Sequence, residues 1–255
     1  MNKQRSYTPT LLACALTLAS TAAAQEASPS NAEREKRVRI LINGAYNPTG
    51  LSFSDTSTFT SFFEEGSASR TYDGGKGVVF EGGVIVGITR ALGVMGSVEI
   101  YQSSFDGSFQ ESLPHPLYFN ELRTVRGDVG GLDYSEKAVH LDAVFTRAFS
   151  SITVDVFAGP TLFFTNTDIL NTVATTSSYP FDEATVTGTS NVRLDDNPIG
   201  FNGGGALTWR LTEVLGIAFQ ARYSRATIAI AREGAEEIEL DAGGFRVGGG
   251  IRIAF

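Results

Sequence analysis

The chain has little of what metal, redox and nucleic-acid-binding proteins need. Its 255 residues include one cysteine and two histidines, and charged residues make up only 19%. A single cysteine excludes a disulfide framework and a cysteine-based zinc site. The net charge of −8 argues against a nucleic-acid partner, because such proteins carry a basic stripe.

Long apolar runs are also missing. No stretch of about 18 consecutive apolar residues follows the N-terminal segment, so a helical membrane span is not expected. The mean hydropathy is close to zero. The chain is instead rich in glycine (28) and phenylalanine (18), a composition that argues against disorder.

The N-terminal segment has the order of a secretory signal peptide. A basic start precedes a short apolar core over residues 11–19, and an alanine triplet follows. We therefore predict a signal peptide over residues 1–24, a polar leader over residues 25–36 and one domain over residues 37–255. Removal of the signal peptide also removes Cys14, so the exported chain is expected to contain no cysteine.

Beyond the leader, side chains alternate with a period of two, as in β-strands. The last segment shows this most clearly, since Phe245, Ile251 and Phe255 share one face while Arg246 and Arg252 lie on the other. Eight segments alternate in this way. They are residues 38–46, 80–88, 94–100, 139–145, 152–162, 201–209, 217–224 and 245–255.

The connections between these segments differ in length. Short turns contain Arg90, Arg147 and Arg210, and the connections at the other end are mostly long. This asymmetry predicts an all-β fold, an eight-stranded antiparallel up-and-down transmembrane β-barrel with short periplasmic turns and long extracellular loops. The connections expected at the outer end are residues 48–76, 104–134, 167–197 and a short one at 232–237.

The number of strands has an alternative. Residues 56–63 and 184–194 also have β character. We interpret them as strand extensions above the membrane, and a ten-stranded barrel is the alternative. Alternation alone does not separate a barrel in lipid from a soluble β protein.

If the face opposite the apolar one points inward on each strand, charged side chains collect in the lumen. Eight strands enclose only enough space for side chains, and an isolated buried ion is costly. A nearly balanced set therefore predicts a plugged, salt-bridged interior, with a conducting path as the alternative. The predicted network consists of Arg39, Glu81, Glu99, Asp142, Asp155, Arg222, Arg246 and Arg252.

The signal peptide, the opening segment 38–46 and the closing segment 243–255 together resemble the small OmpA/OmpX-like outer membrane protein beta-barrel domain family. The resemblance implies an eight-stranded barrel in the outer membrane, in contact with its lipids and lipopolysaccharide. It also implies a role for Ile251, Ile253 and Phe255 as the signal that the barrel assembly machinery reads.

Aromatic residues near the strand ends suit two interfacial girdles. We place Tyr46, Tyr101, Phe105, Phe164 and Tyr223 in the outer girdle. We place Phe145, Trp209, Phe219 and Phe255 in the inner one. A further hypothesis is that residues 178–182 pack on residues 114–119 as a cap.

Candidate catalytic residues are few. His115 lies between two prolines, and His140 shares a face with Asp142, but neither a G-x-S-x-G nor an H-E-x-x-H motif occurs. We expect no catalytic, cofactor-binding or metal-binding residues and no enzyme activity. The acidic residues Asp182, Glu183, Asp195 and Asp196 have no spacing specific for a metal and are interpreted as solvated.

The function expected from these features is a structural or adhesive one, exerted through the extracellular loops. The first alternative is a narrow pore for small solutes or ions. The second is an exported, soluble, lipocalin-like binding protein.

Overall fold

The computed structural model describes residues 37–230 and 238–255, so the expected signal peptide and leader lie outside the described residues. Within this part of the chain, no helix has the length and apolar character needed to cross a membrane. The strands are β1 (Val38–Asn47), β2 (Leu51–Ser61), β3 (Glu64–Gly74), β4 (Gly77–Gly87), β5 (Leu92–Pro114), β6 (Leu122–Phe149), β7 (Ile152–Thr176), β8 (Thr185–Asp196), β9 (Ile199–Arg210), β10 (Leu215–Ile230) and β11 (Ile238–Ala254).

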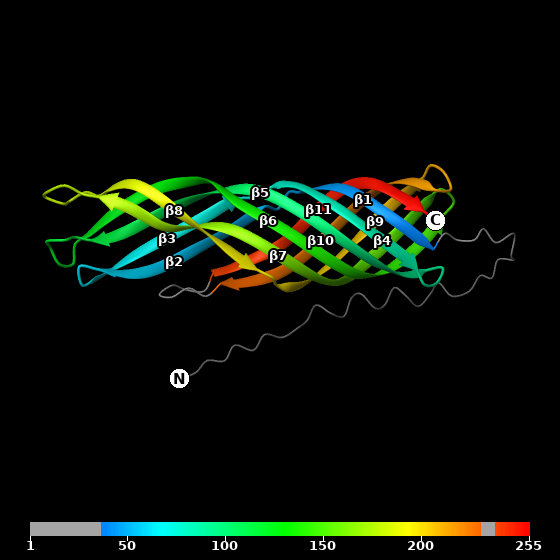
Figure 1. Ribbon diagram of the computed structural model, residues 1–255, viewed down its shortest axis with the longest axis horizontal. Helices are drawn as coiled ribbons and strands as arrows, with labels where there is room; N and C mark the ends of the chain where they lie inside the picture. The colour runs from blue at the N-terminus through cyan, green and yellow to red at the C-terminus, as the bar shows by residue number, and fades with distance from the viewer. Residues whose placement is uncertain (1–36, 231–237) are drawn as a thin grey trace, which may run out of the picture. The chain divides into compact units, whose positions relative to one another are not determined.

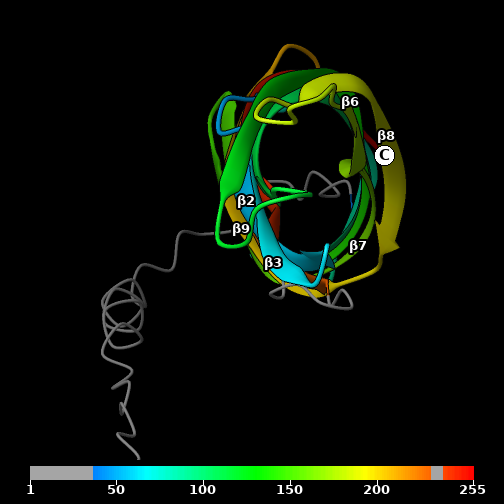
Figure 2. The ribbon, with the colours of Figure 1, turned by 90° about the vertical axis from the view of Figure 1, so that its left-hand side faces the viewer.

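Eight strands close into an antiparallel ring (Figure 2). The first and last strands close it, with Ile42 opposite Ile251 and Tyr46 opposite Val247. The ring runs β1, β4, β5, β6, β7, β9, β10, β11 and back to β1. These strands contain the eight alternating segments of the sequence, so the predicted fold and strand number are confirmed.

The other three strands lie outside the ring, at the end opposite the C-terminus (Figure 1). β2 and β3 form a hairpin that pairs with the outer part of β5, and β8 pairs with the outer part of β7. The ten-stranded alternative is therefore wrong, because none of the three closes into the ring.

The three long connections are present and consist largely of strands. The interpretation of residues 56–63 and 184–194 as strand extensions is confirmed, since they lie mostly in β2 and in β8. The short connection expected at residues 232–237 lies outside the described residues. Residues 48–76 contain the β2–β3 hairpin, residues 104–134 are mostly β5 and β6 running on past the ring, and residues 167–197 are β7 and β8. Pairing continues there because the side chains still alternate with a period of two.

The polarity of this alternation reverses along the strands. We call the part of the ring nearer the short turns the lower barrel. The upper extension consists of β2, β3 and β8 together with the outer parts of β5, β6, β7, β10 and β11. In the lower part of β5, Val98 is exposed while Glu99 is buried; in its upper part, Gln110 is exposed while Phe109 is buried. The same reversal occurs in β11, where Phe245 is exposed below and Asp241 is exposed above. The lower barrel is thus apolar outside and polar inside, whereas the upper extension has the arrangement of a water-soluble protein.

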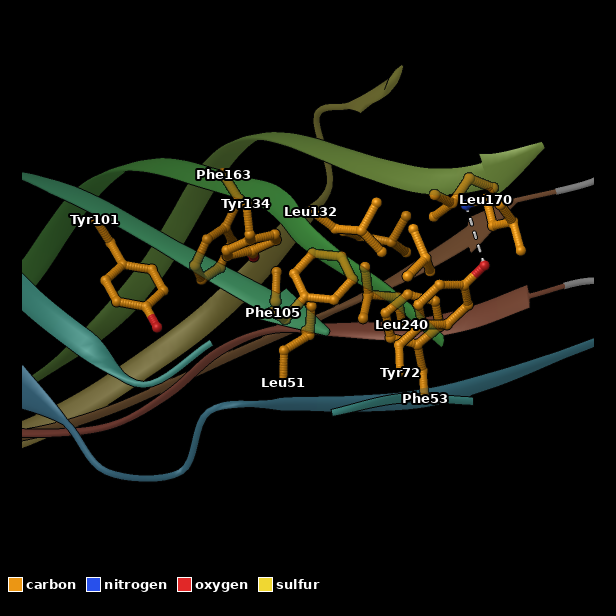
Figure 3. Close-up of a cluster of buried hydrophobic side chains, with 14 of the residues drawn as sticks. Leu51, Phe53, Tyr72, Tyr101, Phe105, Leu132, Tyr134, Phe163, Leu170 and Leu240 are labelled. Carbon is orange, nitrogen blue, oxygen red and sulfur yellow. Dashed lines mark hydrogen bonds between the residues drawn. The ribbon is translucent and has the colours of Figure 1, made fainter. Parts of the chain in front are cut away.

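A hydrophobic core fills the upper extension (Figure 3). Phe53 stacks on Tyr72 with ring centroids 4.5 Å apart, and both contact Phe105 edge-on. Across the core, the Tyr72 hydroxyl oxygen accepts a hydrogen bond from the Leu170 amide N–H at 3.2 Å. The β2–β3 hairpin is therefore held to β5 and β7 by buried side chains as well as by strand pairing.

Candidate functional site

The outer surface of the lower barrel carries apolar side chains on all eight strands of the ring. A soluble monomer rarely exposes an apolar patch larger than a few hundred Å². The band includes exposed Ile42, Phe80, Val98, Leu141, Val156, Leu207, Phe219 and Ile251.

Aromatic side chains flank this band. Tyr46, Phe164 and Tyr223 are exposed near its upper edge, and Trp209 and Phe255 are exposed near the short turns. A closed antiparallel barrel with such a band between two aromatic girdles is built to span an outer membrane. The chain is an outer-membrane β-barrel.

The structure corrects the placement of two residues that we assigned to the outer girdle. Tyr101 and Phe105 are buried, 3% and 2% exposed, and point into the barrel. Both lie on β5 where its polarity reverses, so an aromatic residue there faces the upper core rather than the lipid.

The interior of the barrel at membrane depth is centred on Arg222 of β10. Its guanidinium donates to Glu81 Oε1 at 2.8 Å and lies 3.4 Å from Asp142 Oδ2 and 3.5 Å from Glu99 Oε1. The ring of Phe157 lies 4.7 Å from the guanidinium carbon. Arg222 is only 1% exposed, so these three carboxylates compensate a charge that has left water.

Two further branches extend this network. Arg246 forms ion pairs with Glu99 and with Glu136, near the level of the upper core. Arg252 donates to the Asn43 amide oxygen at 2.5 Å and to the Gln220 amide oxygen at 2.8 Å. The amide groups of Asn43 and Gln220 in turn donate to Glu81 Oε2, each at 2.7 Å.

Arg39 and Asp155 form a separate pair near the short turns. The Arg39 guanidinium donates to both oxygens of Asp155, at 2.9 and 2.8 Å, and to the Thr146 hydroxyl at 2.9 Å. The structure thus brings six of the eight predicted charges into one connected set through Asn43 and Gln220, and places the other two together apart from it.

Several members of the network were not predicted. Glu136 lies on the same face of β6 as His140 and Asp142, so the even spacing was a usable signal. Asn43, Gln220 and Asn202 carry no charge, and their positions on inward faces were the only signal. Asn202 donates to Asp142 Oδ1 at 2.7 Å and accepts from Arg222 at 3.1 Å.

His140 is a member of this network as well. Its Nδ1 lies 2.8 Å from the Thr161 hydroxyl and its Nε2 lies 3.4 Å from Glu99 Oε2. The residue is 1% exposed. A substrate from the cell surface has no access to this imidazole, which favours a structural role.

Little open volume is left inside the barrel at this depth. A cavity of about 10 Å³ lies beside Glu81, Arg222 and Arg246. That volume holds about one water molecule. Directly above it, the buried rings of Tyr101 and Tyr134 begin the upper core, with centroids 5.9 Å apart (Figure 3).

The upper extension contains a second buried ion cluster. Arg70 donates to Asp55 Oδ2 at 3.1 Å and to Glu111 Oε1 at 3.4 Å, joining β2, β3 and β5. Burial raises the pKa of Glu111 above its ordinary value, although the charge of Arg70 acts in the opposite direction. This ion cluster continues the buried interior of the extension beyond the hydrophobic core, toward its outer end.

The predicted cap contact is present between the two segments. His115 Nε2 lies 3.6 Å from Asp182 Oδ1, and its Nδ1 accepts the amide N–H groups of Leu117 and Tyr118, both at 3.1 Å. Arg123 donates to the Ser177 hydroxyl and to the Phe181 carbonyl. His115 therefore organises a loop. In the described part of the chain, no group of three or more His, Cys, Asp or Glu side chains is arranged to hold a metal.

Sequence comparison finds no matching protein-family model and no matching curated protein. Solved structures with a similar fold include three outer-membrane barrels. They are outer membrane protein OprG from Pseudomonas aeruginosa (9% identity, 87% of this chain and 97% of that chain, TM-score 0.45), the N-terminal beta-barrel domain of Pseudomonas aeruginosa OprF (11%, 87% and 100%, 0.40) and outer membrane protease OmpT from Escherichia coli (7%, 89% and 99%, 0.46).

Proposed function

We propose that this barrel is a non-conducting surface protein, which anchors a folded extracellular extension in the outer membrane and acts through that extension. The observation that carries the proposal is the occupied interior. An ion network fills the barrel at membrane depth, and a hydrophobic core closes it above.

The band and its upper edge support the proposed contacts with lipid and lipopolysaccharide. Lys76 and Lys137 are exposed at the level where the strand polarity reverses. Basic side chains at this level suit the phosphate groups of lipopolysaccharide. At the other end, Ile251 and Phe255 point outward beside the short turns, and their recognition by the barrel assembly machinery is still a prediction.

The conductance of the refolded chain tests the proposal. In a planar bilayer, we expect no single-channel steps, because an ion would have to displace paired charges and then cross packed aromatic rings. A porin reconstituted in the same way is the positive control. The fluorescence of Trp209, the only tryptophan, shows whether the chain has inserted. Reproducible current steps would support the pore alternative instead.

Cysteine labelling tests the orientation. The only cysteine of the chain is Cys14, in the expected signal peptide. We expect a membrane-impermeant maleimide to label a Ser69→Cys variant on intact cells, because Ser69 is exposed on β3 of the extension. A Ser150→Cys variant, in the turn between β6 and β7, should react only after the outer membrane is permeabilised. The reverse pattern would mean that the extension faces the periplasm.

A further inference from the structure

Three loops meet at the outer end of the extension. Asn120 donates its amide N–H to Glu64 Oε1 at 2.6 Å, which joins the β5–β6 loop to the β2–β3 turn. The contact between His115 and Asp182 joins the same loop to the β7–β8 loop. We call residues 62–65, 115–121 and 177–183 together the outer tip.

Aromatic side chains of the outer tip are exposed to solvent. Phe63 is 97% exposed, Tyr179 is 81% exposed and Phe119 is 72% exposed. These side chains add little to the packing of the extension, so their contribution to its stability is small. They come from three different loops, which the contacts above hold in one surface.

The β2–β3 turn gives independent support. Ser61 pairs with Glu64, and the two residues between them, Phe62 and Phe63, have positive φ angles of 52° and 65°. A two-residue turn of this kind favours Asn-Gly, because positive φ is unfavourable for bulky side chains. Phenylalanine at both positions works against folding, which indicates a use for the exposed rings.

The charge of the outer tip has one sign. Its acidic side chains are Glu64, Glu65, Glu121, Asp182 and Glu183, and its three segments contain one histidine, His115, but no lysine or arginine. The neighbouring Arg123 is buried and is engaged by Ser177 and by the carbonyl groups of Phe181 and Pro114. This surface repels anionic partners and attracts cationic ones.

A cavity of about 370 Å³ opens in the outer tip at the β7–β8 loop. It is lined by residues of this loop and of the adjoining strand ends, namely Thr176, Ser177, Ser178, Pro180, Asp182, Glu183 and Thr185, and Tyr179 lies between two of them in the chain. Carboxylates pair with arginine or lysine, and an aromatic face attracts the same cations.

We propose that the outer tip binds a basic segment of another protein. An arginine or lysine side chain enters the cavity beside Asp182 and Glu183, and apolar side chains next to it pack on the exposed aromatic rings. This inference rests on the proposed surface function and names its partner class.

The test measures binding of a short peptide in which arginine alternates with leucine to the full refolded chain in lipid nanodiscs. A peptide with glutamate in place of arginine, and empty nanodiscs, are the controls. We expect the arginine peptide to bind and the glutamate peptide not to bind. A double variant Asp182→Asn, Glu183→Gln should weaken binding about tenfold or more.

A second double variant, Phe62→Asn with Phe63→Gly, places the favoured residues in the turn and should fold at least as well as the wild type. We expect it to weaken binding about tenfold as well. The matched control is Asp73→Asn with Asp128→Asn, which removes the same charge from the exposed wall of the extension and should change binding less than about twofold.

If the Asp73→Asn, Asp128→Asn control weakens peptide binding as much as the Asp182→Asn, Glu183→Gln variant does, the proposal is overturned in favour of general attraction to an acidic protein. Binding to phosphatidylcholine vesicles that depends on Phe62 and Phe63 but not on Asp182 and Glu183 would overturn it in favour of a lipid partner. The conductance of the same preparation distinguishes failure of this inference from failure of the proposed function. If the barrel gives no current steps and the peptide does not bind, only this inference is contradicted. If the barrel gives current steps, the proposed function is contradicted.

Discussion

Replacing Arg222 with methionine is expected to lower the free energy of unfolding of the barrel by about 3–5 kcal/mol. The substitution keeps an unbranched side chain of similar length but leaves Glu81, Asp142 and Glu99 without the guanidinium that they share. Glu99 keeps its ion pair with Arg246, but Glu81 and Asp142 lose theirs. Unpaired carboxylates at this depth cannot regain water, because lipid surrounds the barrel and the upper core closes it. Urea unfolding in lipid vesicles, followed by the fluorescence of Trp209, measures the change.

Arg225→Met is the matched control on the same strand. Arg225 pairs with Asp241 at 2.7 Å, but both side chains are about half exposed, so water replaces the lost contact. We expect little change in stability. Adding Glu81→Gln to the Arg222→Met variant should restore part of the loss, since it removes one uncompensated charge. Equal stability of the Arg222→Met and Arg225→Met variants would contradict the central role given to Arg222.

The second large effect is expected from Phe105→Ala in the upper core. Phe105 is 2% exposed and contacts Phe53 and Tyr72, so its truncation leaves a cavity where three strands meet. Such a change costs about 3–5 kcal/mol. We expect the β2–β3 hairpin to open locally while the ring stays folded, because the lipid-facing strands do not depend on this core.

Limited trypsin digestion of the inserted protein measures this opening. Cleavage after Arg70 and Lys76 should become faster in the Phe105→Ala variant than in the wild type. Phe80→Ala is the control, because Phe80 is 66% exposed on the lipid-facing surface and its loss leaves no cavity in the extension. Unchanged protection of the hairpin in the Phe105→Ala variant would show that strand pairing alone holds it.

The ring was predictable from the sequence because the rule behind it is local. A strand between lipid and a filled lumen must alternate apolar and polar or small side chains, and each of the eight segments does so without reference to the others. The short turns at Arg90, Arg147 and Arg210 then set the direction of each hairpin. The inward faces of Glu81, Asp142 and Arg222 follow from the same alternation.

The upper extension was harder to predict because its surroundings differ. Above the membrane the exposed face meets water, so a polar outward face no longer separates a strand from a solvated loop. Residues such as Ser67, Ser69 and Thr71 indicate a loop by composition, yet they form the outer face of β3. The positions of Tyr101 and Phe105 were misread for the same reason.

The sequence alone therefore determined the eight alternating segments, the apolar face of each and which charges lie on the opposite face, since these follow from alternation within each segment. The structure decided between eight and ten strands, because pairing around the ring is not local. Only the tertiary structure decided which charges meet. Glu81 and Arg222 are 141 residues apart and pair because closure of the ring sets the register of every strand. It also brought the three loops of the outer tip together, because their contacts depend on how far β2, β3 and β5 to β8 extend beyond the membrane.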